Sequence, residues 1–200
     1  FRTYLAIIAF ATVLVDVFGM RAGNADFQPF ETAFRNSLFQ VVSIITTTGY
    51  GTADFDQWNQ LGRGLLLLLM FVGGCAGSTG GGMKVIRHIL FFKILRIEVE
   101  GSFQPKEVRL LKLGGKATED QTLRHSILVY FGLIIALFAF GFLFVVAFES
   151  DLTWGTNPQN KLIDSASAVA STLNNIGPGL GVIGSTENYA NFSVPSKSLF

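Results

Sequence analysis

The stretch from Ile127 to Phe148 contains no charged residue. A helix needs about 20 consecutive, mostly apolar residues to cross the hydrocarbon core of a bilayer, and this stretch is long enough. Residues 3–20 form a second apolar stretch, whose only charged residue is Asp16. Of the 200 residues, 50% are hydrophobic and 14% are charged, whereas soluble domains have about 25% charged residues. We therefore expect an all-α membrane protein.

The composition also argues against several functions. The apolar content excludes a disordered chain, and a net charge of +1 excludes nucleic-acid binding driven by bulk charge. A single cysteine, Cys75, excludes a disulfide framework, and His88 and His125 are the only histidines. We expect neither an enzyme nor a protein with a covalently bound cofactor, and no nucleic-acid partner.

Residues 61–97 contain two apolar segments separated by a glycine-rich run. Each glycine disfavours a helix by about 1 kcal/mol relative to alanine, so we predict a helix broken by a loop. Irregular backbone at membrane depth must face protein or a water-filled cavity. A phosphate-binding loop is excluded because Met83 follows Gly82 where that motif requires lysine. A purely structural kink remains an alternative.

Two shorter segments, 30–46 and 161–173, are too polar or too short to cross a membrane alone. Each follows an apolar stretch and precedes a glycine-containing run, so the order of elements repeats with an offset of 128 residues. Within the repeat, the identical pairs are Ser37 and Ser165, Val41 and Val169, Ser43 and Ser171, Gly49 and Gly177, and Gly51 and Gly179. Internal repeats are common in membrane transporters. The chain begins inside an apolar run, so we expect it to be a fragment of a longer protein.

The glycine-containing runs suit a binding site for a dehydrated cation. Backbone carbonyls can replace the water of the ion if successive C=O groups face the same way. This requires unusual φ and ψ values at alternate positions, which glycine adopts at little cost. The C-terminus of the preceding helix would add a partial negative charge. The sequence TTGYG at 47–51 differs at one position from the TVGYG of potassium-channel filters. The alternative is a turn at a helix end. The predicted filter residues are Thr47, Thr48, Gly49, Tyr50, Gly51, Asn175, Ile176, Gly177, Pro178 and Gly179.

Three motifs together resemble the Trk/Ktr/HKT superfamily of potassium transporters, most closely its bacterial TrkH subunits. They are TTTGYG at 46–51, STLNNIGPG at 171–179 and GGCAGSTGGGMK at 73–84. The resemblance implies M1–P-loop–M2 repeats of potassium-channel type, with re-entrant pore helices and a broken M2 helix. It assigns residues 1–97 to the third repeat, 98–123 to a cytoplasmic linker and 124–200 to a fourth repeat truncated at the start of M2.

The resemblance further implies potassium uptake across the inner (plasma) membrane by a multi-pass protein. Potassium, the transported ligand, would bind at Thr47, Thr48, Gly49, Asn175, Ile176 and Gly177. Glycine at positions 49 and 177 favours potassium, since plant members with serine at one such position transport sodium. The implied partners are membrane lipid, a second copy in a homodimer and a cytoplasmic nucleotide-binding subunit resembling TrkA. The implied gate is the loop that holds Gly73, Gly74, Gly77, Ser78, Thr79, Gly80, Gly81 and Gly82.

A different transport mechanism remains open from the residues alone. The broken helix could form a midplane site in a cation-coupled secondary transporter, a symporter.

Basic residues outnumber acidic ones between 84 and 124, and acidic residues outnumber basic ones in 21–63 and 149–187. By the positive-inside rule, the linker lies in the cytoplasm and both glycine-containing runs face outward.

Several charged residues and one short segment have simpler interpretations. Asp54 and Asp56 could attract cations at a pore mouth or merely solvate a loop. Lys84 and Arg87 fit anchors at the membrane interface. The sequence VRLLKL within the linker is compatible with a short strand, and the linker could dock a regulator or simply connect two repeats.

Overall fold

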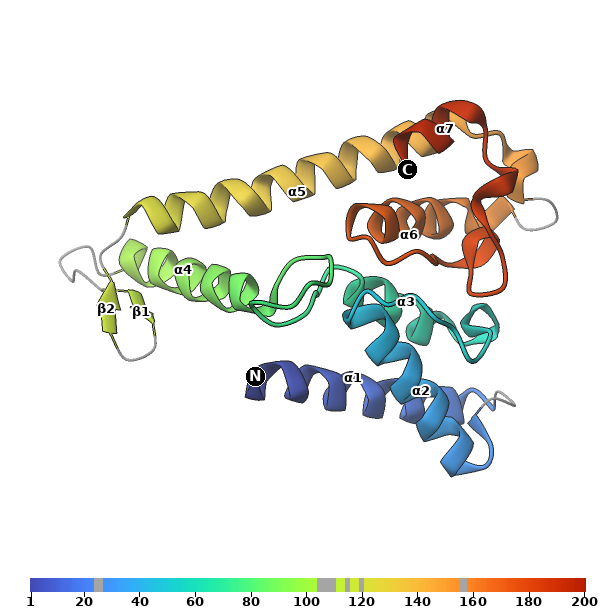
Figure 1. Ribbon diagram of the computed structural model, residues 1–200, viewed down its shortest axis with the longest axis horizontal. Helices are drawn as coiled ribbons and strands as arrows, with labels where there is room; N and C mark the ends of the chain where they lie inside the picture. Colours follow the sequence, from blue (N-terminus) through green and yellow to red (C-terminus); the bar gives the residue numbers. More distant parts are fainter. Residues whose placement is uncertain (24–26, 104–110, 114–115, 119–120, 155–157) are drawn as a thin grey trace.

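The computed structural model describes residues 1–23, 27–103, 111–113, 116–118, 121–154 and 158–200. Helices dominate the described chain, and Figure 1 shows their arrangement. The helices are α1 (Arg2–Arg21), α2 (Phe30–Ile45), α3 (Gln60–Leu69), α4 (Val85–Phe103), α5 (Gln121–Phe148), α6 (Lys161–Leu173) and α7 (Val194–Leu199). Short 3-10 turns are η2 (Phe55–Gln57), η3 (Asp151–Trp154), η4 (Pro158–Asn160), η5 (Gly181–Ile183) and η6 (Tyr189–Asn191).

Both predicted spanning segments are helical. Within the described residues, α1 and α5 are long and apolar enough to cross a membrane. Large apolar side chains on α5 are exposed, among them Phe140 at 63% and Leu143 at 63% of their surface. A soluble monomer rarely exposes a contiguous apolar surface of this kind, which marks contact with lipid or with other protein. The predicted short helices 30–46 and 161–173 correspond to α2 and α6.

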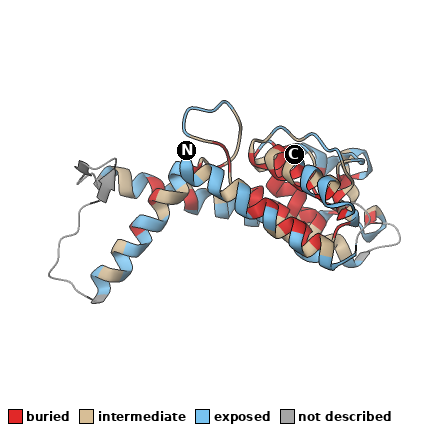
Figure 2. Ribbon diagram, turned by 90° about the horizontal axis from the view of Figure 1, so that it is seen from below, coloured by how far each residue is buried: buried red, intermediate tan, exposed pale blue. Residues whose placement is uncertain are grey.

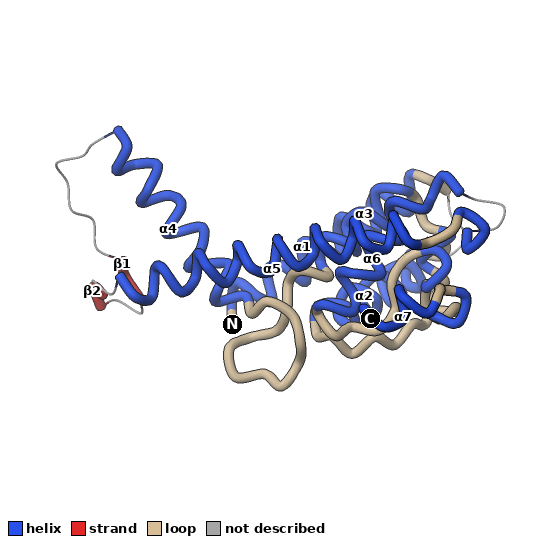
Figure 3. Tube along the Cα trace, turned by 90° about the horizontal axis from the view of Figure 1, so that it is seen from above, coloured by secondary structure: helices blue, strands red, loops and turns tan. Residues whose placement is uncertain are grey.

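The all-α prediction needs one addition, a two-stranded antiparallel ribbon between α4 and α5. Strands β1 (Leu111–Leu113) and β2 (Lys116–Thr118) pair with Lys112 opposite Ala117. The strand predicted in VRLLKL is therefore confirmed for its last part, and residues 108–110 lie outside the described residues. Figure 3 shows that α5 starts beside this ribbon, whereas α4 runs away from α5 and ends at a distance from the strands.

The helices on either side of the predicted linker 98–123 extend further than expected. Helix α4 continues to Phe103 and α5 already begins at Gln121. An ion pair between Arg96 and Glu100, with Nε and Oε1 2.8 Å apart, supports the last turns of α4. Pairs at this spacing stabilise a helix even where its residues are polar, which is why the change in composition does not mark its end.

The main core lies where α1, α2 and α3 meet. Figure 2 shows that buried residues gather in the half of the molecule that holds the C-terminus. Its outer end is aromatic: the Phe27 and Trp58 rings lie edge to face with their centroids 5.1 Å apart. A Cβ added at Gly19 of α1 would collide with the Phe27 ring, so this glycine allows the close approach. A second core forms between α4 and α5, where Phe91 stacks on Phe131 at 4.2 Å. A third joins α5, α6 and the segment around Phe192.

Candidate ion-conducting site

Helices α2 and α6 end at equivalent positions of the repeat, and the chain leaves them in the same way. The Thr48 N–H donates to the Ser43 carbonyl at 2.9 Å, and the Ile176 N–H donates to the Ser171 carbonyl at 2.8 Å. These bonds fold the residues after each helix back over its last turn. The repeat predicted from sequence order is therefore also a repeat of backbone geometry.

The backbone torsions of the two segments match as well. Thr47 and Asn175 both have a φ of 56°, and they are the only non-glycine residues with positive φ in the described part of the chain. Two positions further on, Gly49 has a φ of 76° and Gly177 a φ of 110°. Positive φ is costly for a residue with a side chain, of order 1–3 kcal/mol, and such strain is typical of functional sites. The alternation that aligned carbonyls require is present in both copies.

The two predicted filter segments lie directly against each other. A Cβ added at Gly49 would collide with the carbonyl oxygen of Ile176 and would lie 3.0 Å from Cδ of Pro178. A Cβ added at Gly51 would lie 2.6 Å from Cβ of Ser185, a residue that follows the second segment. Residues about 128 positions apart in the chain thus share one site.

Two carbonyls of the predicted filter already accept hydrogen bonds from protein. The Ser43 hydroxyl donates to the Tyr50 carbonyl at 2.6 Å, and the Tyr189 hydroxyl donates to the Gly177 carbonyl at 2.8 Å. The sequence interpretation did not single out Tyr189. Its only signal was an aromatic hydroxyl a short distance after the second glycine-containing run.

The glycine-rich run forms a loop between α3 and α4 with a closed neck. The Gly73 N–H donates to the Met83 carbonyl at 2.8 Å, and the Val85 N–H donates to the Gly74 carbonyl at 3.2 Å. Within the loop, Lys84 Nζ lies 3.0 Å from both Oγ and the carbonyl oxygen of Ser78. It also lies 2.5 Å from the Gly80 carbonyl oxygen. Lys84 is therefore an internal brace of the loop rather than a free interfacial anchor.

The returning arm of this loop, at Gly80 and Gly81, contacts the chain where each predicted filter segment begins. The Gly81 N–H donates to Oγ1 of Thr47 at 2.7 Å. A Cβ at Gly80 would lie 2.9 Å from the carbonyl oxygen of Thr46, and one at Gly81 would collide with the carbonyl oxygen of Asn174. Glycine is required here because the loop backbone packs directly on the ends of α2 and α6.

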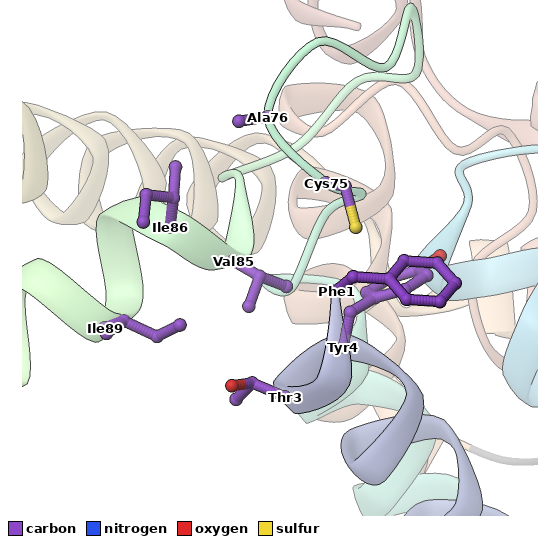
Figure 4. Close-up of a pocket in the computed structure, with 8 residues that line it drawn as sticks. All are labelled: Phe1, Thr3, Tyr4, Cys75, Ala76, Val85, Ile86 and Ile89. Atoms are coloured by element: carbon purple, nitrogen blue, oxygen red, sulfur yellow. The ribbon is translucent and has the colours of Figure 1, made fainter. Parts of the chain in front are cut away.

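A cavity of about 290 Å³ lies at the base of the loop, where α1 approaches the start of α4 (Figure 4). Tyr4 and Cys75 line it together with the apolar side chains of Val85, Ile86 and Ile89. The side chains that line it are uncharged, so it is an apolar space beside the loop.

Asp54 and Asp56 have different environments beyond the first filter segment. Asp54 accepts a hydrogen bond from the Asp56 N–H at 3.2 Å and so caps η2. Asp56 Oδ1 accepts a hydrogen bond from the Gly181 N–H at 2.5 Å. Burial raises the pKa of Asp56 to about 6, because the Gly181 bond and the Arg63 guanidinium offset the burial only in part. Asp56 is thus tied to the second repeat and does not merely solvate a loop.

No group of three or more His, Cys, Asp or Glu side chains in the described ranges could hold a metal ion.

Comparison with known proteins identifies the class as cation transport. The family described as "TrkH: Cation transport protein" matches residues 3–200. The chain is 36% identical over 166 residues to the Trk system potassium uptake protein TrkH of Salmonella typhimurium. It is 40% identical over 151 residues to the protein of the same name from Vibrio parahaemolyticus. These alignments cover 83% and 76% of this chain, and 32% and 29% of the relatives.

A solved structure agrees with this assignment. The crystal structure of the potassium transporter TrkH from Vibrio parahaemolyticus matches with a TM-score of 0.79 and 32% identity, over 99% of this chain and 39% of that one. This chain belongs to the TrkH family of cation transport proteins, as the resemblance of its motifs predicted. It spans about a third of the length of the relatives it matches.

Proposed function

We propose that this chain supplies two walls of a potassium-selective pore in a potassium uptake protein. Ions would pass in single file along the carbonyls of Thr47–Gly51 and Asn175–Gly179. The observation that carries the proposal is the pair of segments that lie against each other, with equivalent hydrogen bonds and with positive φ at equivalent positions. The names of its relatives support potassium as the substrate.

The same proposal assigns the parts of the chain to repeats. Residues 1–97 would form one M1–P–M2 repeat with α2 as a re-entrant pore helix and α3 and α4 as a broken M2. Residues 98–123 would form a cytoplasmic linker, and 124–200 a second repeat with α6 as its pore helix. The separate helices α3 and α4 and the matching ends of α2 and α6 support this division. The whole would be a multi-pass protein of the inner membrane.

We also propose partners for the whole protein. It would assemble as a homodimer, and the linker would dock a nucleotide-binding cytoplasmic subunit similar to TrkA. The relatives are named as members of a Trk system, which supports regulation by further subunits.

The loop from Gly73 to Gly82 is proposed as the gate. It lies against Thr47 and Asn174, at the inner ends of both filter segments, where a bulky backbone would obstruct an ion leaving the filter. This placement favours a gated pore over a carrier with its binding site at the helix break, because the loop packs onto the filter segments.

Ion flux through the purified full-length protein in vesicles tests the pore directly. A pore predicts single-channel current steps and rubidium uptake that exceeds sodium uptake. Strict stoichiometric coupling of potassium to a second cation, without current steps, would contradict the pore and support the symporter.

Replacing Lys84 with methionine should raise rubidium uptake by about fivefold, because loss of its charged hydrogen bonds frees the loop to leave the filter. The ratio of rubidium to sodium uptake should not change, since the hydrogen bonds of the Lys84 ammonium group go to Ser78 and Gly80 of the loop. Arg87→Met is the matched control: Arg87 lies 4.0 Å from the centroid of the Tyr130 ring, so its removal should not raise uptake. Equal uptake by the Lys84 variant and the unmodified protein would contradict the brace.

A further inference from the structure

A buried cluster of charges joins the two repeats beside the outer ends of the filter segments. Arg63 comes from α3 of the first repeat, and Asp164 from the first turn of α6 in the second repeat. The Arg63 Nη2 and Asp164 Oδ1 atoms lie 3.3 Å apart, and the exposed fractions of the two side chains are 5% and 2%. Arg63 Nε also lies 3.9 Å from Oδ1 of Asp56.

The two carboxylates hold the backbone that follows the second filter segment. Asp56 accepts the hydrogen bond from the Gly181 N–H, and the backbone of Val182 is hydrogen-bonded to Asp164. Gly181 lies so close to the Asp164 carboxylate that a Cβ there would collide with it, and Gly184 is equally close to Asp56. The turn after Gly179 is therefore fixed by charges from both repeats.

Further hydrogen bonds run along the same junction. The Ser167 hydroxyl accepts from the Leu180 N–H at 2.8 Å, and the Ser185 hydroxyl donates to the Ala53 carbonyl at 3.2 Å. The first repeat has Asn36 at the position equivalent to Asp164. The carboxylate that Asp164 contributes is therefore not repeated at the equivalent position of the first repeat.

We propose that Arg63, Asp56 and Asp164 form an inter-repeat clamp that positions the outer end of the second filter segment, and that this clamp controls the preference for potassium over sodium. The proposal rests on the proposed pore. None of the three side chains contacts the ion path in this account. They are positioning residues, which act by fixing the distance between the two filter segments. Selectivity depends on the arrangement of the coordinating carbonyls, so a loosened filter should admit sodium.

The test compares rubidium and sodium uptake by vesicles containing full-length variants Arg63→Met, Asp164→Asn and Asp56→Ala. Each should lower the ratio of rubidium to sodium uptake by about fivefold or more. The double variant Arg63→Met with Asp164→Asn should lower this ratio by less than the product of the two single effects, because both changes remove the same interaction. Asp151→Asn is the control. Asp151 forms an ion pair with Lys161, but its side chain is 74% exposed, so this change should leave the ratio unchanged.

Size-exclusion chromatography of the detergent-solubilised variants separates this effect from misfolding. A folded Arg63→Met protein with an unchanged uptake ratio would overturn the clamp. If Arg63→Met does not fold, the uptake ratio is measured for Asp56→Ala and Arg63→Lys instead. An unchanged ratio of rubidium to sodium uptake in both of these variants would overturn the clamp. The pore proposal is judged separately through Gly49: an altered ratio in Gly49→Ser with unaltered ratios in all clamp variants would refute the clamp alone.

Discussion

Replacing Gly49 with serine should lower the ratio of rubidium to sodium uptake by at least about tenfold, a change of about 1.4 kcal/mol. The new Cβ would collide with the carbonyl oxygen of Ile176 and press on Pro178. It would also stand at a φ of 76°, which side-chain-bearing residues rarely adopt. Either the two filter segments separate or the backbone at Gly49 changes, and both outcomes disturb the carbonyls proposed to select potassium. Rubidium and sodium uptake by vesicles containing the full-length protein measures the effect.

Two other glycines provide graded controls for this prediction. Gly177 has a φ of 110°, but a Cβ added there would have no atom within 4 Å. Gly177→Ala should therefore lower the uptake ratio less than Gly49→Ser does, through backbone strain alone. Gly132 lies in α5 with open space around it, and Gly132→Ala should leave uptake unchanged. Gly49→Val should abolish uptake. A folded Gly49→Ser protein with normal uptake and selectivity would rule out position 49 as part of a filter.

Removing residues 77–82 should raise rubidium uptake by about tenfold or more. The deletion takes away Gly80 and Gly81, which contact the inner ends of α2 and α6. The hydrogen bonds of the loop neck, between Gly73 and Met83 and between Gly74 and Val85, lie outside the deleted residues. The obstruction should therefore be removed while α3 and α4 stay covalently joined through Cys75 and Ala76. Initial uptake rates per amount of reconstituted protein give the measurement.

Thr79→Ala is the control within the loop, because Thr79 is exposed and this substitution leaves the length of the loop unchanged. It should transport at the normal rate. If the deleted protein inserts normally and its uptake does not rise, the loop is a structural kink and the gate must lie elsewhere.

Much of the helical architecture could be predicted from local sequence. The charge-free run 127–148 is helical, and the short, weakly polar segment 161–173 matches α6 from Lys161 to Leu173. The break in 61–97 followed from its glycines, and α3 and α4 are indeed separate helices. The end of α4 could not be predicted in the same way, because the ion pair between Arg96 and Glu100 supports polar turns beyond the apolar segment.

The predicted filter segments show which properties local sequence predicts and which depend on tertiary contacts. The residues TTGYG and NIGPG, with an offset of 128, predicted two equivalent segments with unusual φ and ψ values at alternate positions. Nothing in either run predicted that Gly49 would lie against the Ile176 carbonyl, or that Tyr189 would donate to the Gly177 carbonyl. Lys84, a lysine at the start of an apolar segment, was predicted to be an interfacial anchor, yet its ammonium group braces the loop.

The sequence by itself determined which segments are helical, where glycine interrupts them and that one unit occurs twice. These properties depend on residues a few positions apart, through helix propensity, apolar length and the torsions that glycine permits. Only the tertiary structure decided which segments meet: the bonds of Arg63 to Asp164 and of Gly181 to Asp56 span 101 and 125 residues. A side chain's partner at that separation is set by how the helices pack, and local sequence patterns carry no record of it.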